Sequence, residues 1–121
     1  MKTFKRSQRL ADQIKRDVAT IVLKLFQDKG SHIPTISAVE VTDDLRYAKV
    51  YYTVLGDDDT RAHTKESLTR LSGRIQGELA QVLRVRRMPE ISFHFDTSLE
   101  QGMRILTILD QLKSEDHDAT N

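Results

Sequence analysis

Arginines surround a Ser–Gly pair in the middle of this chain. Arg70 and Arg74 flank Ser72 and Gly73, and a further run of basic residues precedes the next proline: Arg84, Arg86 and Arg87. Guanidinium groups donate forked hydrogen bonds to phosphate oxygens. A helix junction that opens at Ser72–Gly73 would leave backbone N–H groups free, and the glycine would let a ligand come close to them. The pattern therefore predicts an anionic partner, such as a nucleic-acid backbone. On these residues alone, a packing kink with solvated arginines is an equally good interpretation.

Two further basic groups extend this candidate site. One lies near the N-terminus, at Lys5, Arg6 and Arg9, and the other at an expected hairpin, at Arg46 and Lys49. The net charge is only +1, but residues 1–29 carry eight Lys and Arg against three Asp, and residues 110–121 carry one Lys against four acids. A basic front and an acidic tail are typical of nucleic-acid-binding proteins. Ordinary solvated charge remains the alternative for both groups.

Aromatic side chains offer a weaker indication of RNA binding. Tyr47, Tyr51 and Tyr52 could stack on bases as the aromatic residues of an RRM sheet do. Strand alternation, however, places Tyr51 and Tyr52 on opposite faces of a sheet. Packing in the core or on the sheet surface is therefore the favoured interpretation, and His94 is expected to face solvent.

Other chemistries find little support in the sequence. Asp57–Asp59 lacks the interspersed ligands and the distal Glu of a calcium loop, and the four His residues lack zinc-site spacing. Ser72 does not lie in a nucleophile elbow, and no P-loop occurs. Asp43, Asp44 and Asp96 could be arranged around magnesium as a nuclease site, but a turn explains Asp44 better and a helix cap explains Asp96 better. We expect no catalysis, no metal and no cofactor.

Apolar spacing predicts the elements that hold these residues. Recurrence every three or four positions indicates helices, and alternation indicates strands. The expected elements are a loose basic arm over 1–6, a helix capped by Ser7 and ending near Gln27, strands at 35–42 and 48–55, paired helices over about 60–86 with a kink at Ser72–Gly73, a strand around Ile91–Phe95, and a last helix over about 98–112.

This order predicts an α+β fold. A β-hairpin followed by two helices and a third strand gives a three-stranded sheet with helices on one face. The order α-β-β-α-kink-α-β, with a C-terminal helix added, is that of a type II KH domain, a fold that clamps a nucleic-acid backbone. We expect one such domain over 1–113 and a disordered acidic tail over 114–121. The absence of cysteine, of a signal peptide and of an apolar run of about 18 residues fits a cytoplasmic protein.

From Arg6 to Leu112 the sequence resembles the ribosome-binding factor A family of bacterial small-subunit assembly factors. The segments that carry the resemblance are Arg6-x-x-Arg9, Val39-Glu40-Val41, Asp44-Leu45-x-x-Ala48-Lys49-Val50-Tyr51, Ser72-Gly73, Leu83-Arg84-Val85-Arg86, Pro89-Glu90-Ile91-x-Phe93 and Asp96-x-Ser98. Their order and spacing make the likeness specific.

The resemblance implies a KH fold in which a kinked Ala-x-Gly replaces the usual Gly-x-x-Gly clamp. It also implies binding to free 30S subunits and 16S rRNA, a role in late subunit maturation and 5′-end processing of 16S rRNA, importance in the cold, and release aided by assembly GTPases. The chain departs from the family in three places. Asp28-Lys29-Gly30-Ser31 replaces a usual Asp-Pro-Arg, Leu71 replaces Ala, and Gln76 stands where Arg is common. Leu71 and Gln76 are therefore left out of the candidate site.

We accordingly expect a non-catalytic, monomeric RNA-binding factor. Its candidate RNA-binding residues are Lys5, Arg6, Arg9, Arg46, Lys49, Arg70, Ser72, Gly73, Arg74, Arg84, Arg86 and Arg87. The alternative is a protein-interaction adaptor that uses the acidic tail and the last helix, with incidental basic charge. A metal-dependent nuclease is a third possibility, and it would require RNA cleavage that stops with a chelator.

Overall fold

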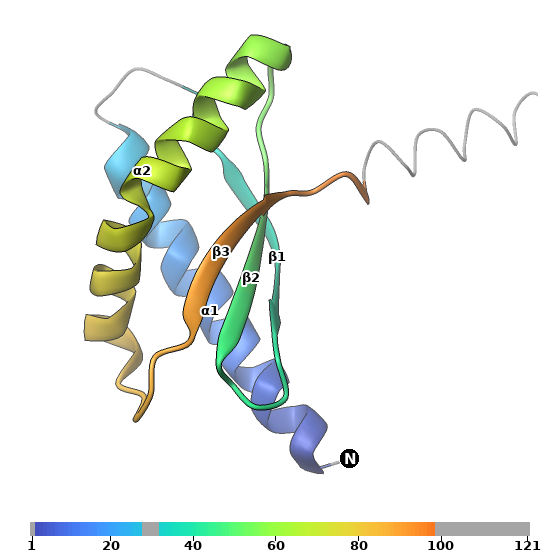
Figure 1. The fold of residues 1–121 in the computed structure, drawn as a ribbon, viewed down its shortest axis with the longest axis vertical. Coiled ribbons are helices and arrows are strands. Elements are labelled where there is room, and N and C mark those ends of the chain that lie inside the picture. Colours follow the sequence, from blue (N-terminus) through green and yellow to red (C-terminus); the bar gives the residue numbers. More distant parts are fainter. Residues whose placement is uncertain (1, 28–31, 99–121) are drawn as a thin grey trace, which may run out of the picture.

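A three-stranded sheet and two long helices make up the computed structural model, which describes residues 2–27 and 32–98, with residues 2–5 described by backbone alone. Its elements are α1 (Lys2–Gln27), β1 (Thr35–Val41), β2 (Tyr47–Thr53), α2 (Asp58–Leu83) and β3 (Glu90–Phe95). Central β2 pairs with β1 antiparallel and with β3 parallel (Figure 1). This is the predicted α+β order. The expected last helix and acidic tail lie outside the described residues.

The first helix begins earlier than its expected cap. α1 starts at Lys2, so residues 2–6 are helical rather than a loose arm, and Ser7 lies inside the helix. No Pro or Gly precedes Ser7, and a Ser inside a helix costs only a fraction of a kcal/mol, roughly 0.5. Leu10 packs against the core, so the buried stripe extends back toward this end. The preference of Ser for the cap position was therefore too weak to set the boundary.

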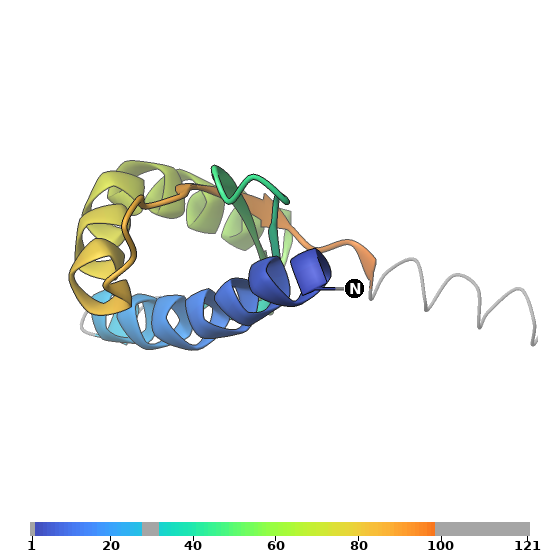
Figure 2. The same cartoon turned by 90° about the horizontal axis from the view of Figure 1, so that it is seen from below.

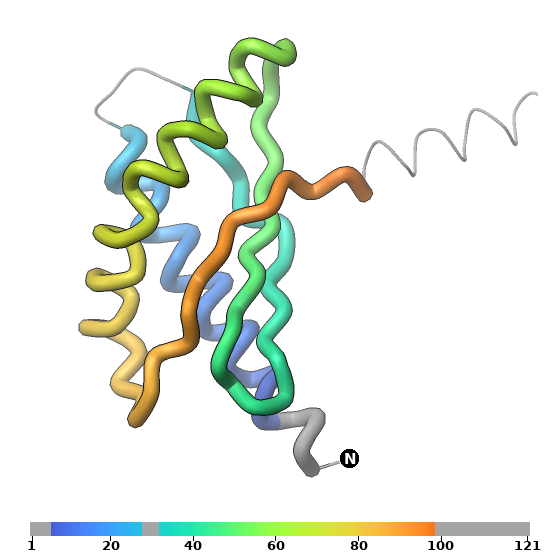
Figure 3. The backbone as a smooth tube through the Cα atoms, viewed as in Figure 1, coloured from blue at the N-terminus to red at the C-terminus, as the bar shows by residue number. Residues whose placement is uncertain are grey.

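The second helix is continuous, whereas the sequence pattern predicts two helices. α2 runs unbroken over 26 residues, and Figures 1 and 3 show its axis bending about midway. Near the bend, the Ser72 hydroxyl donates a hydrogen bond of 2.8 Å to the carbonyl of Thr69. Such a bond to the preceding turn competes with the helical ladder and often bends a helix. The predicted kink is thus present as a bend without a break.

Both ends of α2 are set by local side-chain and backbone chemistry. At the start, the Asp57 carboxylate accepts the backbone N–H of Thr60 at 2.9 Å, and this bond lowers the pKa of Asp57. The acids that follow favour the positive end of the helix. At the end, Arg84 adopts a left-handed conformation (φ 51°), so the helix stops at Leu83 instead of Arg86. The run Asp57–Asp59 therefore begins a helix and is not simply a solvated loop.

One face of the sheet carries the whole core. The side chains with no exposed surface include Ile14, Val18 and Val22 of α1, Leu68, Ile75 and Leu79 of α2, and Ala48 and Val50 of β2. The alternate residues of β2, Tyr47 and Lys49, are exposed. Both helices therefore cover the same face, as predicted, and leave the other face of the described sheet open. Neither α1 nor α2 is long and apolar enough to cross a membrane.

Candidate nucleic-acid interface

Three basic segments lie at one end of the molecule. The start of α1, the β1–β2 hairpin and the loop between α2 and β3 are all at the lower end of Figure 1. Figure 2 looks onto that end, with the loop at the left and the start of α1 at the right. A hydrogen bond of 2.8 Å from the Glu90 N–H to the Arg46 carbonyl ties the loop to the hairpin. All six arginines of these segments are exposed, and we call them the basic end: Arg6, Arg9, Arg46, Arg84, Arg86 and Arg87.

The hairpin holds Arg46 through a tight turn. The N–H of Leu45 donates to the carbonyl of Thr42 at 2.8 Å, and Leu45 has a φ of 61°. The Asp44 carboxylate accepts the Thr42 hydroxyl at 2.6 Å and the Arg46 N–H at 3.1 Å. These bonds, the Thr42 bond first, lower the pKa of Asp44. Asp44 is therefore a turn residue, as the sequence pattern predicts, and its carboxylate is hydrogen-bonded within the turn.

The loop that carries Arg84, Arg86 and Arg87 is anchored by a residue that the sequence reasoning had set aside. The side-chain amide of Gln76 donates to the carbonyl of Pro89 at 2.6 Å and accepts the N–H of Ile91 at 2.9 Å. Both backbone groups lie at the start of β3, on the edge that faces away from β2. The amide thus substitutes for a neighbouring strand. In the sequence, the available signal for this role was the position of Gln76, a polar residue next to Ile75 of the apolar stripe.

The bend of α2 holds a second group of candidates, away from the basic end. Arg70 and Gly73 are exposed, and the Nε of Arg74 lies 3.8 Å from Oε2 of Glu78. Glu78 also forms an ion pair with Lys24, whose Nζ lies 3.5 Å from Oε1 of Glu78. Because α2 is continuous, the backbone N–H groups here belong to the helical ladder. The expected opening of the helix junction, with free N–H groups for a phosphate, is therefore wrong, and part of the Arg74 charge is paired.

Alanine at Gly73 should stabilise the fold and weaken binding to RNA. A Cβ at Gly73 or at Gly77 would meet nothing within 4 Å, so each Gly→Ala change should raise the free energy of unfolding by about 1 kcal/mol. Only Gly73 lies between Arg70 and Arg74, so only its methyl group would hinder a phosphate that these two arginine side chains hold. We expect several-fold weaker binding to 30S subunits for Gly73→Ala alone. Equal binding by both variants would make the bend purely structural.

Two candidates remain, Lys49 and Lys5. Lys49 is exposed on the open sheet face, while the side chain of Lys5 lies outside the described residues. At the opposite end of the molecule, α2 begins with Asp58 and Asp59 after the cap residue Asp57. The basic end also carries the exposed acids Asp43, Asp44 and Glu90, but its six arginines outnumber them. This polarity between the two ends can orient the chain in the field of an anionic partner.

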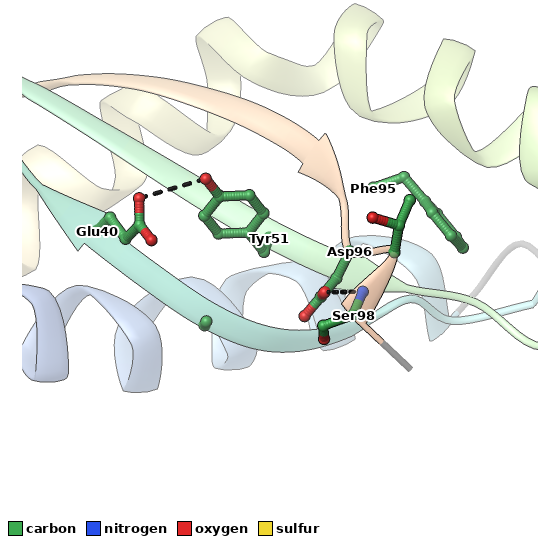
Figure 4. A pocket seen from close by; sticks show the side chains of 7 residues that line it. Glu40, Tyr51, Phe95, Asp96 and Ser98 are labelled. Carbon is green, nitrogen blue, oxygen red and sulfur yellow. Dashed lines mark hydrogen bonds between the residues drawn. The ribbon is translucent and has the colours of Figure 1, made fainter. Parts of the chain in front are cut away.

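The described residues do not bring Asp44 and Asp96 together as a nuclease site. Asp44 and Asp96 lie at opposite ends of β2, roughly 20 Å apart at the usual rise per strand residue. Figure 4 shows Asp96 beside Ser98, whose N–H it accepts at 2.8 Å, and it also accepts the Ser37 hydroxyl at 2.5 Å. These bonds, the Ser37 bond first, lower the pKa of Asp96. Among the described residues, no group of His, Asp and Glu could hold a metal ion.

Comparison with known proteins places the chain in a family. The sequence model of ribosome-binding factor A matches residues 6–109. The chain belongs to the ribosome-binding factor A family. The ribosome-binding factor A of Chromobacterium violaceum is 41% identical over 115 residues, which cover 95% of this chain and 83% of that protein. The family match spans every candidate RNA-binding residue except Lys5.

Solved structures of ribosome-binding factor A share the fold. The crystal structure from Thermus thermophilus has a TM-score of 0.61 and 25% identity, covering 73% of this chain and 93% of that one. Coordinates of the Thermus thermophilus protein fitted into a cryo-EM map of a 30S complex give a TM-score of 0.61 and 24% identity, covering 72% and 91%. The family structures have a KH-like fold, so the predicted fold class is confirmed.

Proposed function

We propose that this chain is a ribosome-assembly factor that binds the free 30S subunit through 16S rRNA. It assists late maturation, including processing of the 5′ end of 16S rRNA, and catalyses no reaction itself. The observation that carries the proposal is the convergence of exposed arginines from three segments at one end of a ribosome-binding factor A fold. The fitted Thermus thermophilus 30S complex supports the same partner. The proposed location is the cytoplasm, where 30S subunits are assembled.

Binding energy is sufficient to explain such a role. A protein that contacts one rRNA conformation more favourably than another shifts the population toward the first. Arginines at the basic end neutralise phosphates and release counterions, so affinity depends steeply on salt. The acids at the far end are repelled by RNA, which orients the molecule as it approaches. We propose that the chain acts as a monomer and that assembly GTPases aid its release.

Co-sedimentation with purified 30S subunits and with intact 70S ribosomes, over a salt series, tests this function. We expect retention on 30S subunits alone. If the six arginines of the basic end contact phosphates, affinity should fall about 1,000-fold between 50 and 200 mM salt. Equal binding to both particles, or to neither, contradicts the proposal.

A truncation tests the part of the adaptor alternative that depends on the acidic tail. The adaptor would use the acidic tail and the last predicted helix, whereas the basic end lies within residues 6–87. A chain ending at residue 113 keeps every candidate RNA contact and loses only the acidic tail. Its affinity for 30S subunits should equal that of the full chain. Loss of binding on removal of the tail would favour the adaptor.

A further inference from the structure

The open face of the sheet displays aromatic and polar side chains that the core does not need. Tyr47 is 51% exposed, and Lys49 is also exposed on the same face of β2. Tyr51 is half-buried there, two residues further along the strand, while Tyr52 points to the other face and is only 2% exposed. The sequence therefore separates Tyr51 from Tyr52 as predicted, but leaves two tyrosines on one face.

A third ring joins them from the neighbouring strand. His94 of β3 lies opposite Tyr51 in the parallel register, with the ring centroids 5.8 Å apart and the planes at 41°. The Tyr51 hydroxyl donates to Glu40 of β1 at 3.3 Å, and the His94 ring is 2.9 Å from the Ser92 hydroxyl. Figure 4 shows Tyr51 reaching across to Glu40. Contacts on both sides thus hold the Tyr51 and His94 rings in place before any partner arrives.

The charges around these rings suit bases better than phosphates. Lys49 lies between the two tyrosine positions, but Glu40 faces it across the strand pair and Glu90 faces Tyr47. These residues give the open face two negative charges against one positive charge, so it does not attract phosphates as the basic end does. Aromatic rings on a sheet can stack on unpaired bases of any sequence, because every base has a π-face. The phosphates of the same RNA strand would then lie toward Lys49 and the arginines of the basic end.

The open face is continuous with the basic end. Arg46 directly precedes Tyr47, and its carbonyl accepts the N–H of Glu90, the residue that pairs with Tyr47. Only one or two amino-acid residues therefore separate the basic end from the open face. An RNA strand whose phosphates lie on the basic end can continue onto the sheet. Lys49 provides a further positive charge along that route.

We propose that the open sheet face is a stacking platform for unpaired RNA nucleotides, formed by Tyr47, Tyr51 and His94 with Lys49 between the tyrosines. The proposal rests on the RNA-binding function above and adds to it a second surface and a ligand class, single-stranded segments. The phosphate contacts of the basic end do not distinguish paired from unpaired RNA, whereas stacking requires bases that are free of a duplex.

Tyrosine fluorescence gives a direct readout of this platform. The chain has three Tyr and no Trp, and one of the three, Tyr52, is buried on the other face. Titration of the full chain with single-stranded hexauridylate should quench the emission of the exposed tyrosines. A blunt RNA duplex with the same number of phosphates should quench it much less. Absence of quenching by hexauridylate would overturn the proposal.

Paired substitutions separate the rings from the fold. Fluorescence anisotropy of labelled hexauridylate measures affinity for Tyr47→Leu and Tyr51→Leu, with Tyr47→Phe and Tyr51→Phe as matched controls. We expect each Leu variant to bind about tenfold more weakly, as loss of one stacked base implies. The Phe variants should bind like the natural chain, because they keep the ring. Equal affinities for Leu and Phe variants contradict stacking.

Comparison with whole subunits distinguishes this proposal from the function on which it rests. If the Leu variants bind 30S subunits like the natural chain, and quenching is absent, the platform fails while the assembly function stands. If the Leu variants lose 30S binding without any quenching by hexauridylate, the face contacts protein and the proposed RNA occupant is wrong. Quenching that persists without 30S binding supports the platform but contradicts the assembly function.

Discussion

Replacing Arg84, Arg86 and Arg87 together by Glu should reduce affinity for 30S subunits by at least about 100-fold near 0.1 M salt. All three side chains are exposed on the loop between α2 and β3, so the change adds no buried charge. Each lost phosphate contact removes nearly one unit from the slope of log affinity against log salt. We therefore expect the slope to fall by about two to three. Co-sedimentation over a salt series measures both quantities.

A matched variant controls for net charge in this experiment. Lys15→Glu/Arg16→Glu/Lys65→Glu reverses three exposed basic residues outside the basic end. Because the chain carries 19 basic and 18 acidic residues, either triple variant has a net charge of −5. The control should keep most of its affinity and the full salt slope. If both triple variants lose binding equally, overall charge and not the basic end determines association.

The order of elements could be predicted because it depends on short-range patterns. Ile91, Phe93 and Phe95 alternate with polar residues, and the apolar stripes of the helices repeat every three or four positions. Element ends were less predictable. The Ser7 cap preference was overridden where α1 packs on the sheet, and the Ser72 bond to Thr69 bends α2 without interrupting it. Such outcomes depend on tertiary contacts that no local pattern contains.

The candidate site was predictable as a set of residues but not as an arrangement. The sequence pattern names the arginines, yet the parallel register of β2 and β3 decides that the loop before Glu90 lies beside the hairpin. The same register brings His94 next to Tyr51, which strand alternation alone could not reveal. Gln76 acts on residues 13 and 15 positions away, so its role became visible only in three dimensions.

Replacing Gln76 by Leu should destabilise the fold by about 2–3 kcal/mol. Leu fills a similar volume but leaves the Pro89 carbonyl and the Ile91 N–H without their partly buried partners. Thermal unfolding should shift down by roughly 10 °C for a domain of this size. Gln76→Glu tests the cause. A neutral carboxyl group can both donate and accept, as the amide does, whereas a carboxylate can only accept.

The pH dependence of Gln76→Glu follows from that difference. The native fold favours the protonated form of Glu at this position, so its pKa should be raised in the folded state above the usual value of about 4.3. Below that value the Gln76→Glu variant should therefore be nearly as stable as the natural chain. The variant should lose this stability as the pH rises through the folded-state pKa. Chemical denaturation of both proteins from pH 4 to pH 8 measures the difference. A pH-independent difference would show that the two hydrogen bonds at Pro89 and Ile91 are not the cause.

Gln76→Leu also distinguishes positioning from contact at the basic end. The amide touches only the backbone at the start of β3, and the three arginines of the adjoining loop remain in the variant. Where the variant is still folded, a less rigid loop must be ordered on binding, so affinity for 30S subunits should fall several-fold. The number of phosphate contacts is unchanged, so the salt slope should be unchanged too. A reduced slope would mean that phosphate contacts are lost in the variant. Either Gln76 itself contacts the RNA, or the altered loop no longer brings its arginines to the RNA.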